Sequence, residues 1–287
     1  MRNIENLFDV IVIGAGSAGC AVAARLSEDP DVRVLLLEAG GKDSNFWIHV
    51  PVGFFKNIYN PAITWQYVTE PVPGLNGRTI NWPRGRVLGG TSAINGTAYV
   101  RGQAADFDHW RQLGNEGWGY DDILPYFKKA QNQTGTVDEY SGTGGPLHTA
   151  DARMHHVLND AFLAGAEAAG IRRIRDFNGP SNEGAGPYQQ NLRGRWRHST
   201  AGAYLKPARR RRNLVVRTRS QALRVLVEEG VATGVEYLRD GVAECAFASG
   251  EIVLCGGAVN SPQLLELSGI GDGDVLARAG VPLVHHL

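Results

Sequence analysis

The feature that most constrains this chain is a glycine-rich turn set between two short apolar runs near its N-terminal end. Residues 9–13 are continuous and β-branched, which is typical of a strand buried on both faces of a parallel sheet. Gly-Ala-Gly-Ser-Ala-Gly follows at 14–19, and apolar positions then repeat at helical spacing to about residue 28. A second apolar run at 32–37 ends at Glu38. The spacing predicts a βαβ unit, and with it an α/β, Rossmann-like domain built on a parallel sheet.

The glycines of this turn match the G-x-G-x-x-G pattern of dinucleotide-binding folds. We expect Gly14 to form the tight turn off the strand, Gly16 to let a pyrophosphate approach the backbone, and Gly19 to let the helix pack on the strand. The pyrophosphate would lie on the free N–H groups and positive end of the helix that begins near Ser17. Glu38 follows the last glycine by roughly 20 residues, where a carboxylate accepts hydrogen bonds from ribose hydroxyls. The motif predicts a bound dinucleotide and does not separate NAD from FAD.

Glycine is also the unusual element of the composition, at 37 of 287 residues, or about 13% against an ordinary ~7%. A second cluster, at 85–102, surrounds the pair Gly89–Gly90 with small residues and hydrogen-bonding side chains. Such a segment exposes backbone along which a flat, polar-edged ring can lie; its alternative interpretation is a glycine-rich surface loop. A third strand, turn and helix follow at 251–271. There we expect Ser261 at the N-cap, Pro262 at the first helical position and Gly269 just past the helix.

Between these clusters the pattern is mixed. Residues 41–83 lack periodicity and collect aromatic side chains, which predicts either a lid or binding loop, or a surface loop packed on its own aromatics. Helices are expected around 107–113, 122–130 and 154–169, the last ending at Gly170. The segments expected to form a small antiparallel β-meander, with turns at 229–230 and 240–241, are 213–218, 222–228 and 231–239, which lead into a last strand at 251–254.

Charge and composition exclude several classes of protein. Lys+Arg and Asp+Glu both number 29, so no global basic field is available to hold nucleic acid. No apolar run approaches the ~18 residues of a membrane span, and no export signal is recognisable at the N-terminus. The arginine run at 209–212 is interpreted as a solvated turn, with an anionic partner as the alternative. Three cysteines without a CxxC pair predict free thiols and a cytoplasmic location, and no metal site is predicted.

The three glycine-rich stretches together resemble the glucose–methanol–choline (GMC) oxidoreductases, which are FAD enzymes that oxidise alcohols. The resemblance is carried, in order along the chain, by Gly14–Gly41, Gly85–Asp108 and Gly257–Gly271. It implies FAD as the cofactor and a small-molecule alcohol as the substrate. Some family members link FAD covalently through a histidine in the second cluster, but Ile94 and Asn95 stand there, so the resemblance implies non-covalent FAD.

The resemblance also implies which residues bind FAD. Four residues of the first turn would hold the pyrophosphate, Glu38 the adenosine ribose, and the backbone of Ala222 would meet the adenine. Thr91 and the segment 95–98 would lie along the pyrophosphate and flavin. The full expected set is Gly14, Gly16, Ser17, Gly19, Glu38, Ala39, Gly89, Gly90, Thr91, Asn95, Gly96, Thr97, Ala98, Ala222, Gly257 and Ala258.

The resemblance implies a discontinuous domain organisation. The FAD-binding domain, with its inserted antiparallel meander, would take residues 1–45, 78–130 and 204–287. A lid-like loop would take 46–77, and part of a substrate or cap domain would take 131–203.

The family's catalytic histidine motif belongs to a C-terminal half that is not found here, so no catalytic residue is predicted. The eight histidines present are interpreted as ordinary surface or core residues. The leading hypothesis is the FAD-binding part of a truncated or split alcohol oxidoreductase, with a second chain supplying the C-terminal half in the split case. The alternatives are a catalytically idle module that binds FAD or a partner, and an NAD-dependent dehydrogenase, which accounts for the first motif only. Which alcohol is oxidised, and whether oxygen reoxidises the flavin, stays open.

Overall fold

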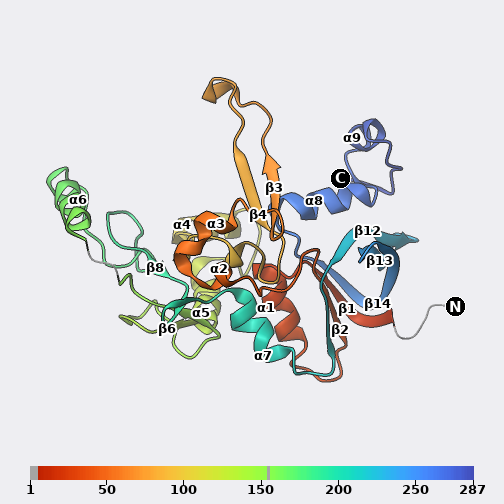
Figure 1. The fold of residues 1–287 in the computed structure, drawn as a ribbon, viewed down its shortest axis with the longest axis horizontal. Coiled ribbons are helices and arrows are strands. Elements are labelled where there is room, and N and C mark those ends of the chain that lie inside the picture. The colour runs from red at the N-terminus through yellow and green to blue at the C-terminus, as the bar shows by residue number, and fades with distance from the viewer. Residues whose placement is uncertain (1–5, 154–155) are drawn as a thin grey trace. The chain divides into compact units, whose positions relative to one another are not determined.

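The structure is a computed structural model that describes residues 6–153 and 156–287 (Figure 1). The chain forms two compact units: Met1–Asn95 with Ser199–Leu287, and Gly96–His198. The sequence placed residues 96–130 with the FAD-binding segments, whereas the contacts place them in the second unit. The assignment of functions to these segments stays a prediction.

The first unit is built on a six-stranded mixed sheet with the strand order β11-β2-β1-β14-β13-β12. The predicted βαβ unit is present, with helix α1 (Ser17–Leu26) connecting the first two strands. The strands are β1 (Leu7–Ile13), β2 (Val34–Leu37), β11 (Leu214–Arg217), β12 (Ser220–Glu228), β13 (Val231–Arg239) and β14 (Val242–Leu254). The α/β class with a parallel sheet and an inserted meander is therefore confirmed.

Two details of the meander differ from the prediction. Strand β11 does not join it but pairs in parallel with β2, because its apolar residues suit a strand between two packed layers. The last strand is also longer than expected, since β14 pairs antiparallel with β13 through Phe247 and then runs parallel to β1 from Glu251 to Leu254. Both predicted hairpin turns are confirmed: residues 229–230 and 240–241 all take positive φ, as a type I′ turn requires.

Side chains of the central strands alternate between two cores, one on each face of the sheet. Val10, Val12 and Leu36 pack against α1 and the segment around Leu205. Ile11, Ile13, Leu35 and Leu37 pack on the other face against Tyr237 and Leu264. This period of two fixes the strand register, because a slip of one residue would exchange the two faces.

Residues 41–83 are more ordered than the sequence predicted. They form the short helices α2 (Phe46–His49) and α3 (Phe54–Asn57), and a hairpin of β3 (Thr64–Val68) with β4 (Asn81–Gly85). The hairpin rises as a long arm in Figure 1. Strand β3 has only five residues, with Trp65 and Tyr67 half-buried and Gln66 and Val68 exposed, and this alternation is too short to stand out among prolines and glycines.

The helix after β14 begins earlier than predicted. Helix α8 spans Gly257–Leu267 with Gly256 at its N-cap, so Ser261 and Pro262 lie inside it. Gly257, with φ of 87°, starts the helix directly from the strand. Pro262 lies inside the helix, where it removes one backbone hydrogen bond. Gly269 lies past the end with φ of 81°, as predicted. Helix α9 (Gly273–Arg278) and the short pair β15 (Ile270–Gly271) and β16 (His285–His286) complete the unit.

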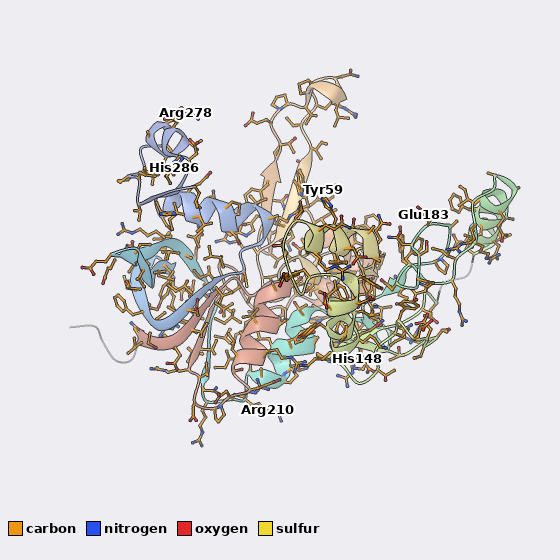
Figure 2. The ribbon with its side chains drawn as sticks, turned by 180° about the vertical axis from the view of Figure 1, so that it is seen from behind. Tyr59, His148, Glu183, Arg210, Arg278 and His286 are labelled. Carbon is orange, nitrogen blue, oxygen red and sulfur yellow. The ribbon has the colours of Figure 1, made fainter. Side chains whose placement is uncertain are left out.

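The arginine run follows α7 (Lys206–Ala208), a short extension of the π-helical turn 201–205. Arg209, Arg210 and Arg212 are exposed, and Arg210 points outward in Figure 2. Arg211 instead donates to the carbonyl of Ala24 and to Ser27 Oγ at 2.9 Å. One arginine of the four therefore caps the negative end of α1, and the rest form the solvated turn that was predicted.

The second unit holds the remaining helices, α4 (Ala104–Gln112), α5 (Tyr120–Ala130) and α6 (Val157–Ala168). They match the predicted helices, and Gly170 takes φ of 82° just beyond α6. Residues 154–155, where the last helix was expected to begin, lie outside the described residues. The short strand pairs are β5 (Ala98–Tyr99) with β8 (Gln189–Gln190), β6 (Gln131–Gln133) with β7 (Leu147–Thr149), and β9 (Leu192–Arg193) with β10 (Trp196–Arg197). Within the described residues, no helix has the length and apolarity to cross a bilayer.

Candidate dinucleotide site

A cavity of about 520 Å³ opens in the first unit, beyond the carboxyl ends of the parallel strands β1, β2 and β14. Ligands of open α/β sheets bind at this edge, because the loops that leave the strands converge there. Ten residues of the predicted FAD set line the cavity: Gly14, Gly16, Ser17, Glu38, Ala39, Gly90, Thr91, Ala222, Gly257 and Ala258. The structure thus brings together residues that the sequence spreads over most of the chain.

Helix α1 presents its N-terminal end to this cavity. Gly14 turns the chain off β1 with φ of 99°, and Gly16 is the N-cap without a side chain to cap the helix. A Cβ on Gly16 would make only ordinary contacts, at 3.9 Å from Cys255 O and from Gly90 Cα, and Gly16 lines the cavity. The first N–H groups of the helix are therefore available to an anion, with the positive end of the helix dipole behind them.

Helix α8 presents a second N-terminal end to the same cavity. Gly257, Ala258 and Val259 are exposed in its first turn, and all three line the cavity. Gly256 at the N-cap likewise offers no side-chain cap. Two uncapped helix ends facing one cavity, together with the positively charged residue Arg84 in its lining, make the site suited to a ligand with negative charge.

The glycine clusters also pack on one another, backbone against backbone. A Cβ on Gly14 would lie 2.5 Å from the carbonyl oxygen of Cys255, and one on Gly90 would lie 2.6 Å from the Cα of Gly16. A Cβ on Gly85 would lie 2.2 Å from Gly90 itself. These glycines therefore have a structural purpose that the sequence does not show: they allow the three turns to meet around the cavity.

Glu38 lies at the end of β2 and is 6% exposed. Its Oε2 accepts from the backbone N–H of Ala15 at 2.9 Å, and its Oε1 accepts from Gly40 N–H at 2.8 Å. Burial raises the pKa of this carboxyl to about 7, although the two N–H donors and the charge of Arg86 act in the opposite direction. Glu38 thus ties the first glycine turn to the end of β2, and each oxygen keeps a second lone pair for a hydroxyl donor.

Six residues of the predicted set are not in the cavity lining. Gly19 packs beneath it, Gly89 turns with φ of 90° beside Ser199 and Ala201, and Asn95 lies further along the chain. The other three, Gly96, Thr97 and Ala98, belong to the second compact unit.

The lining also includes residues that the sequence analysis missed. Trp65 and Arg84 face the cavity from the β3–β4 hairpin, and Asn260 faces it from α8. Trp65 lies in a segment that the sequence predicted to be either a lid or a surface loop. The lid prediction was the available clue to its place in the site. Arg84 and Asn260 lie next to or inside the glycine-rich stretches, where proximity to the motif was the available clue.

None of the residues that line the cavity is a histidine. His148 and His198, in the second unit, meet edge to face with ring centroids 4.9 Å apart, and the backbone N–H of His148 donates to His198 Nδ1 at 3.1 Å. Figure 2 shows His148. Burial, then the neighbouring His148 and Arg193, lowers the pKa of His198 to about 4. We infer a structural role for this pair of histidines, because a proton on His198 Nδ1 would break the hydrogen bond that the backbone N–H of His148 donates to it.

We expect this buried histidine to make the second unit acid-sensitive. The free energy of unfolding is fully retained above pH 6.5 and falls by about 1 to 2 kcal/mol as the pH drops toward 4, because only unfolded His198 takes up a proton there. In the variant H198N the amide oxygen replaces Nδ1 as the acceptor and cannot titrate. Urea unfolding between pH 4 and 8 should show a shallower acid limb for H198N than for wild type, and identical limbs would contradict this role.

Other chemistry is scarce among the described residues. No group of three or more His, Cys, Asp or Glu side chains there is arranged to hold a metal ion. All three cysteines are free thiols, and burial raises the pKa of Cys20, whose Sγ donates to the carbonyl of Ala15, to about 12. A thiol with such a pKa stays protonated and is not a nucleophile at neutral pH.

The fold and the cavity define an α/β protein with a dinucleotide site. The family model described as GMC oxidoreductase matches residues 8–286, and the chain belongs to this family. The mitochondrial choline dehydrogenase of Mus musculus is 45% identical over 98% of this chain and 48% of its own length.

Solved structures agree. Pyridoxine 4-oxidase from Mesorbium loti superposes with a TM-score of 0.93 at 37% identity, over 97% of this chain and 55% of that one. An FAD-dependent oxidoreductase from Chaetomium thermophilum gives a TM-score of 0.89 at 29% identity, over 98% and 50%. The chain therefore spans about half the length of the relatives it matches.

Proposed function

We propose that this chain is the FAD-binding part of an FAD-dependent oxidoreductase that acts on CH–OH groups. The observation that carries the proposal is the convergence of two uncapped helix N-termini, Glu38 and the backbone of three glycine turns on one cavity. Such an arrangement suits a diphosphate joined to a ribose. Membership of the GMC oxidoreductases, and the FAD dependence stated for a solved neighbour, support FAD over NAD.

The residues present fit FAD in this site. The first turn of α1, at Gly16 and Ser17, would hold the pyrophosphate, and Arg84 would balance part of its charge. Glu38 would accept from the ribose hydroxyls with its free lone pairs, while Ala222 would lie along the adenine. The first turn of α8, at Gly257 and Ala258, would meet the other end of the cofactor. The absence of a histidine in the second glycine cluster supports non-covalent binding of FAD.

Bound FAD supplies the site that accepts hydride from the alcohol carbon. This chain's own residues would bind the cofactor and orient it. None of the cavity-lining residues is placed as a base for the hydroxyl proton, since the lining has no histidine. We therefore propose that this proton goes to a group in the C-terminal half that relatives of twice this length possess, supplied by the same polypeptide or by a second chain.

A catalytically idle module that binds FAD is the second candidate. The observation that favours it is that no histidine lines the cavity. The two candidates differ in one measurement. When the polypeptide that supplies the C-terminal half is present, anaerobic addition of choline or of a simple primary alcohol should bleach the flavin spectrum of an oxidoreductase and leave that of an idle module unchanged.

We also retain the predicted organisation, in which residues 1–45, 78–130 and 204–287 bind FAD, 46–77 form a lid and 131–203 belong to a substrate domain. For location, the three free thiols support the reducing cytoplasm.

FAD binding is the first test. Chain that has been stripped of flavin and mixed with FAD should take up one equivalent, quench the flavin fluorescence and gain thermal stability, as expected when a ligand binds only the folded state. NAD at the same concentration should give none of these signals. If FAD produces no change, even when the polypeptide that supplies the C-terminal half is present, the proposed function is wrong.

A further inference from the structure

The β3–β4 hairpin carries an ordered aromatic face toward the cavity. Trp65 and Tyr67 lie on the same side of β3, with ring centroids 6.0 Å apart and ring planes within 8° of parallel. The guanidinium of Arg86 lies 4.5 Å from the centroid of the Trp65 ring. These contacts hold Trp65 in place as one wall of the cavity.

The first turn of α8 also borders the cavity. Asn260 lines the cavity there, and its Nδ2 donates to Tyr67 Oη at 2.7 Å. The same amide has a second, longer contact to Gln263 Oε1 at 3.4 Å. This bond joins residues that are 193 positions apart in the sequence, and Figure 1 shows the base of the hairpin beside the start of α8.

Other hydrogen bonds fix the base of the hairpin: Gly85 N–H donates to Thr91 Oγ1 at 3.1 Å, and Gln66 Nε2 donates to the carbonyl of Ile58 at 2.9 Å. The Tyr67–Asn260 bond joins the hairpin to α8. A two-stranded ribbon is marginally stable by itself, and its outer face, at Val68 and Trp82, is exposed. The ring of Tyr67 contacts Trp65 within the hairpin, so its hydroxyl is the group that reaches α8. One neutral hydrogen bond is strong enough to favour a closed arrangement and weak enough to open on the timescale of binding.

We propose that the Tyr67–Asn260 hydrogen bond is a latch that holds the β3–β4 hairpin over the cofactor cavity and sets the rate at which the dinucleotide enters and leaves. The proposal rests on FAD binding in this cavity. A bond that holds the hairpin over the cavity restrains entry and release alike. Removing it should therefore change both rates in the same direction and leave the equilibrium affinity nearly unchanged.

The test uses Tyr67→Phe, which removes the hydroxyl and keeps the ring stacked on Trp65. The matched control is Tyr59→Phe, at a residue that is 63% exposed and is labelled in Figure 2. In the chain without FAD, amide hydrogen exchange over residues 64–68 should be about three- to tenfold faster in Tyr67→Phe than in the control, as expected for the loss of one hydrogen bond. Unchanged exchange would overturn the latch, whatever the chain binds.

Stopped-flow mixing with FAD then tests the consequence. Association and release should both accelerate about three- to tenfold in Tyr67→Phe, with the dissociation constant changed by less than about twofold. Asn260→Ala should give the same acceleration, and the double variant should add nothing to it, as expected for two partners of one bond. A dissociation constant that rises with the release rate, at a constant association rate, would show that Tyr67 is only part of the binding wall. If the wild-type chain shows no FAD signal, the proposed function fails while the exchange result still decides the latch.

Discussion

Gly19→Ala should unfold the first unit, or cost it more than about 3 kcal/mol of stability, although alanine is the better helix former. The Cβ would lie 1.8 Å from the carbonyl oxygen of Gly14 and 3.2 Å from the Cβ of Cys255. The backbone of Gly14 cannot move away from the new Cβ, because Gly14 itself packs against the backbone of Cys255. The clash therefore spreads to the start of α1 and the end of β14, and FAD binding should be lost along with stability.

Urea unfolding with circular dichroism measures this effect, and Gly165→Ala provides the control. Gly165 also lies inside a helix, α6, but nothing stands within 4 Å of the position where its Cβ would be. That substitution should be neutral or stabilise by up to about 1 kcal/mol. If Gly19→Ala were as stable as Gly165→Ala, the close packing of the first glycine turn would be refuted.

Glu38→Gln should weaken FAD binding by about 100-fold. The wild-type carboxylate accepts from two backbone N–H groups, whereas an amide presents one oxygen and one NH₂, so one donor is left facing another donor in a buried site. The ribose hydroxyls also lose the charged acceptor that makes their bonds strong. Fluorescence titration with FAD measures the change.

The same residue should make FAD affinity depend on pH. Since the pKa of Glu38 is raised to about 7, the carboxylate becomes protonated as the pH falls through 7, and wild-type affinity should fall with it. The contribution of Glu38 to the stability of the ligand-free first unit should show the opposite trend: folding favours the neutral carboxyl, so this contribution is greatest below pH 4.5 and falls by up to about 3 kcal/mol as the pH rises to 7.

Glu38→Gln should flatten both profiles. Glu236→Gln, at a surface partner of Arg224, should leave both of them as in wild type. An unchanged pH profile in Glu38→Gln would show that another group controls binding.

The sequence by itself determined the elements whose cause is local. The first βαβ unit follows from the periodicity of its apolar residues and from the turn at Gly14. The type I′ turns at 229–230 and 240–241 follow from residues that tolerate positive φ. Ten of the cavity residues could also be predicted, from the glycine motifs and from the family resemblance that they carry. None of these inferences needed knowledge of a distant contact.

Only the tertiary structure decided features that depend on residues far apart in the chain. Strand β14 changes partner from β13 to β1 along its length, and β11 joins β2, since burial and not propensity selects strand neighbours. The tight packing of Gly90 on Gly16 and the bond from Asn260 to Tyr67 are likewise invisible in the sequence. The reason is physical. Hydrophobic periodicity shows which face of an element is buried, but the element that covers this face is determined by the packing of the whole chain.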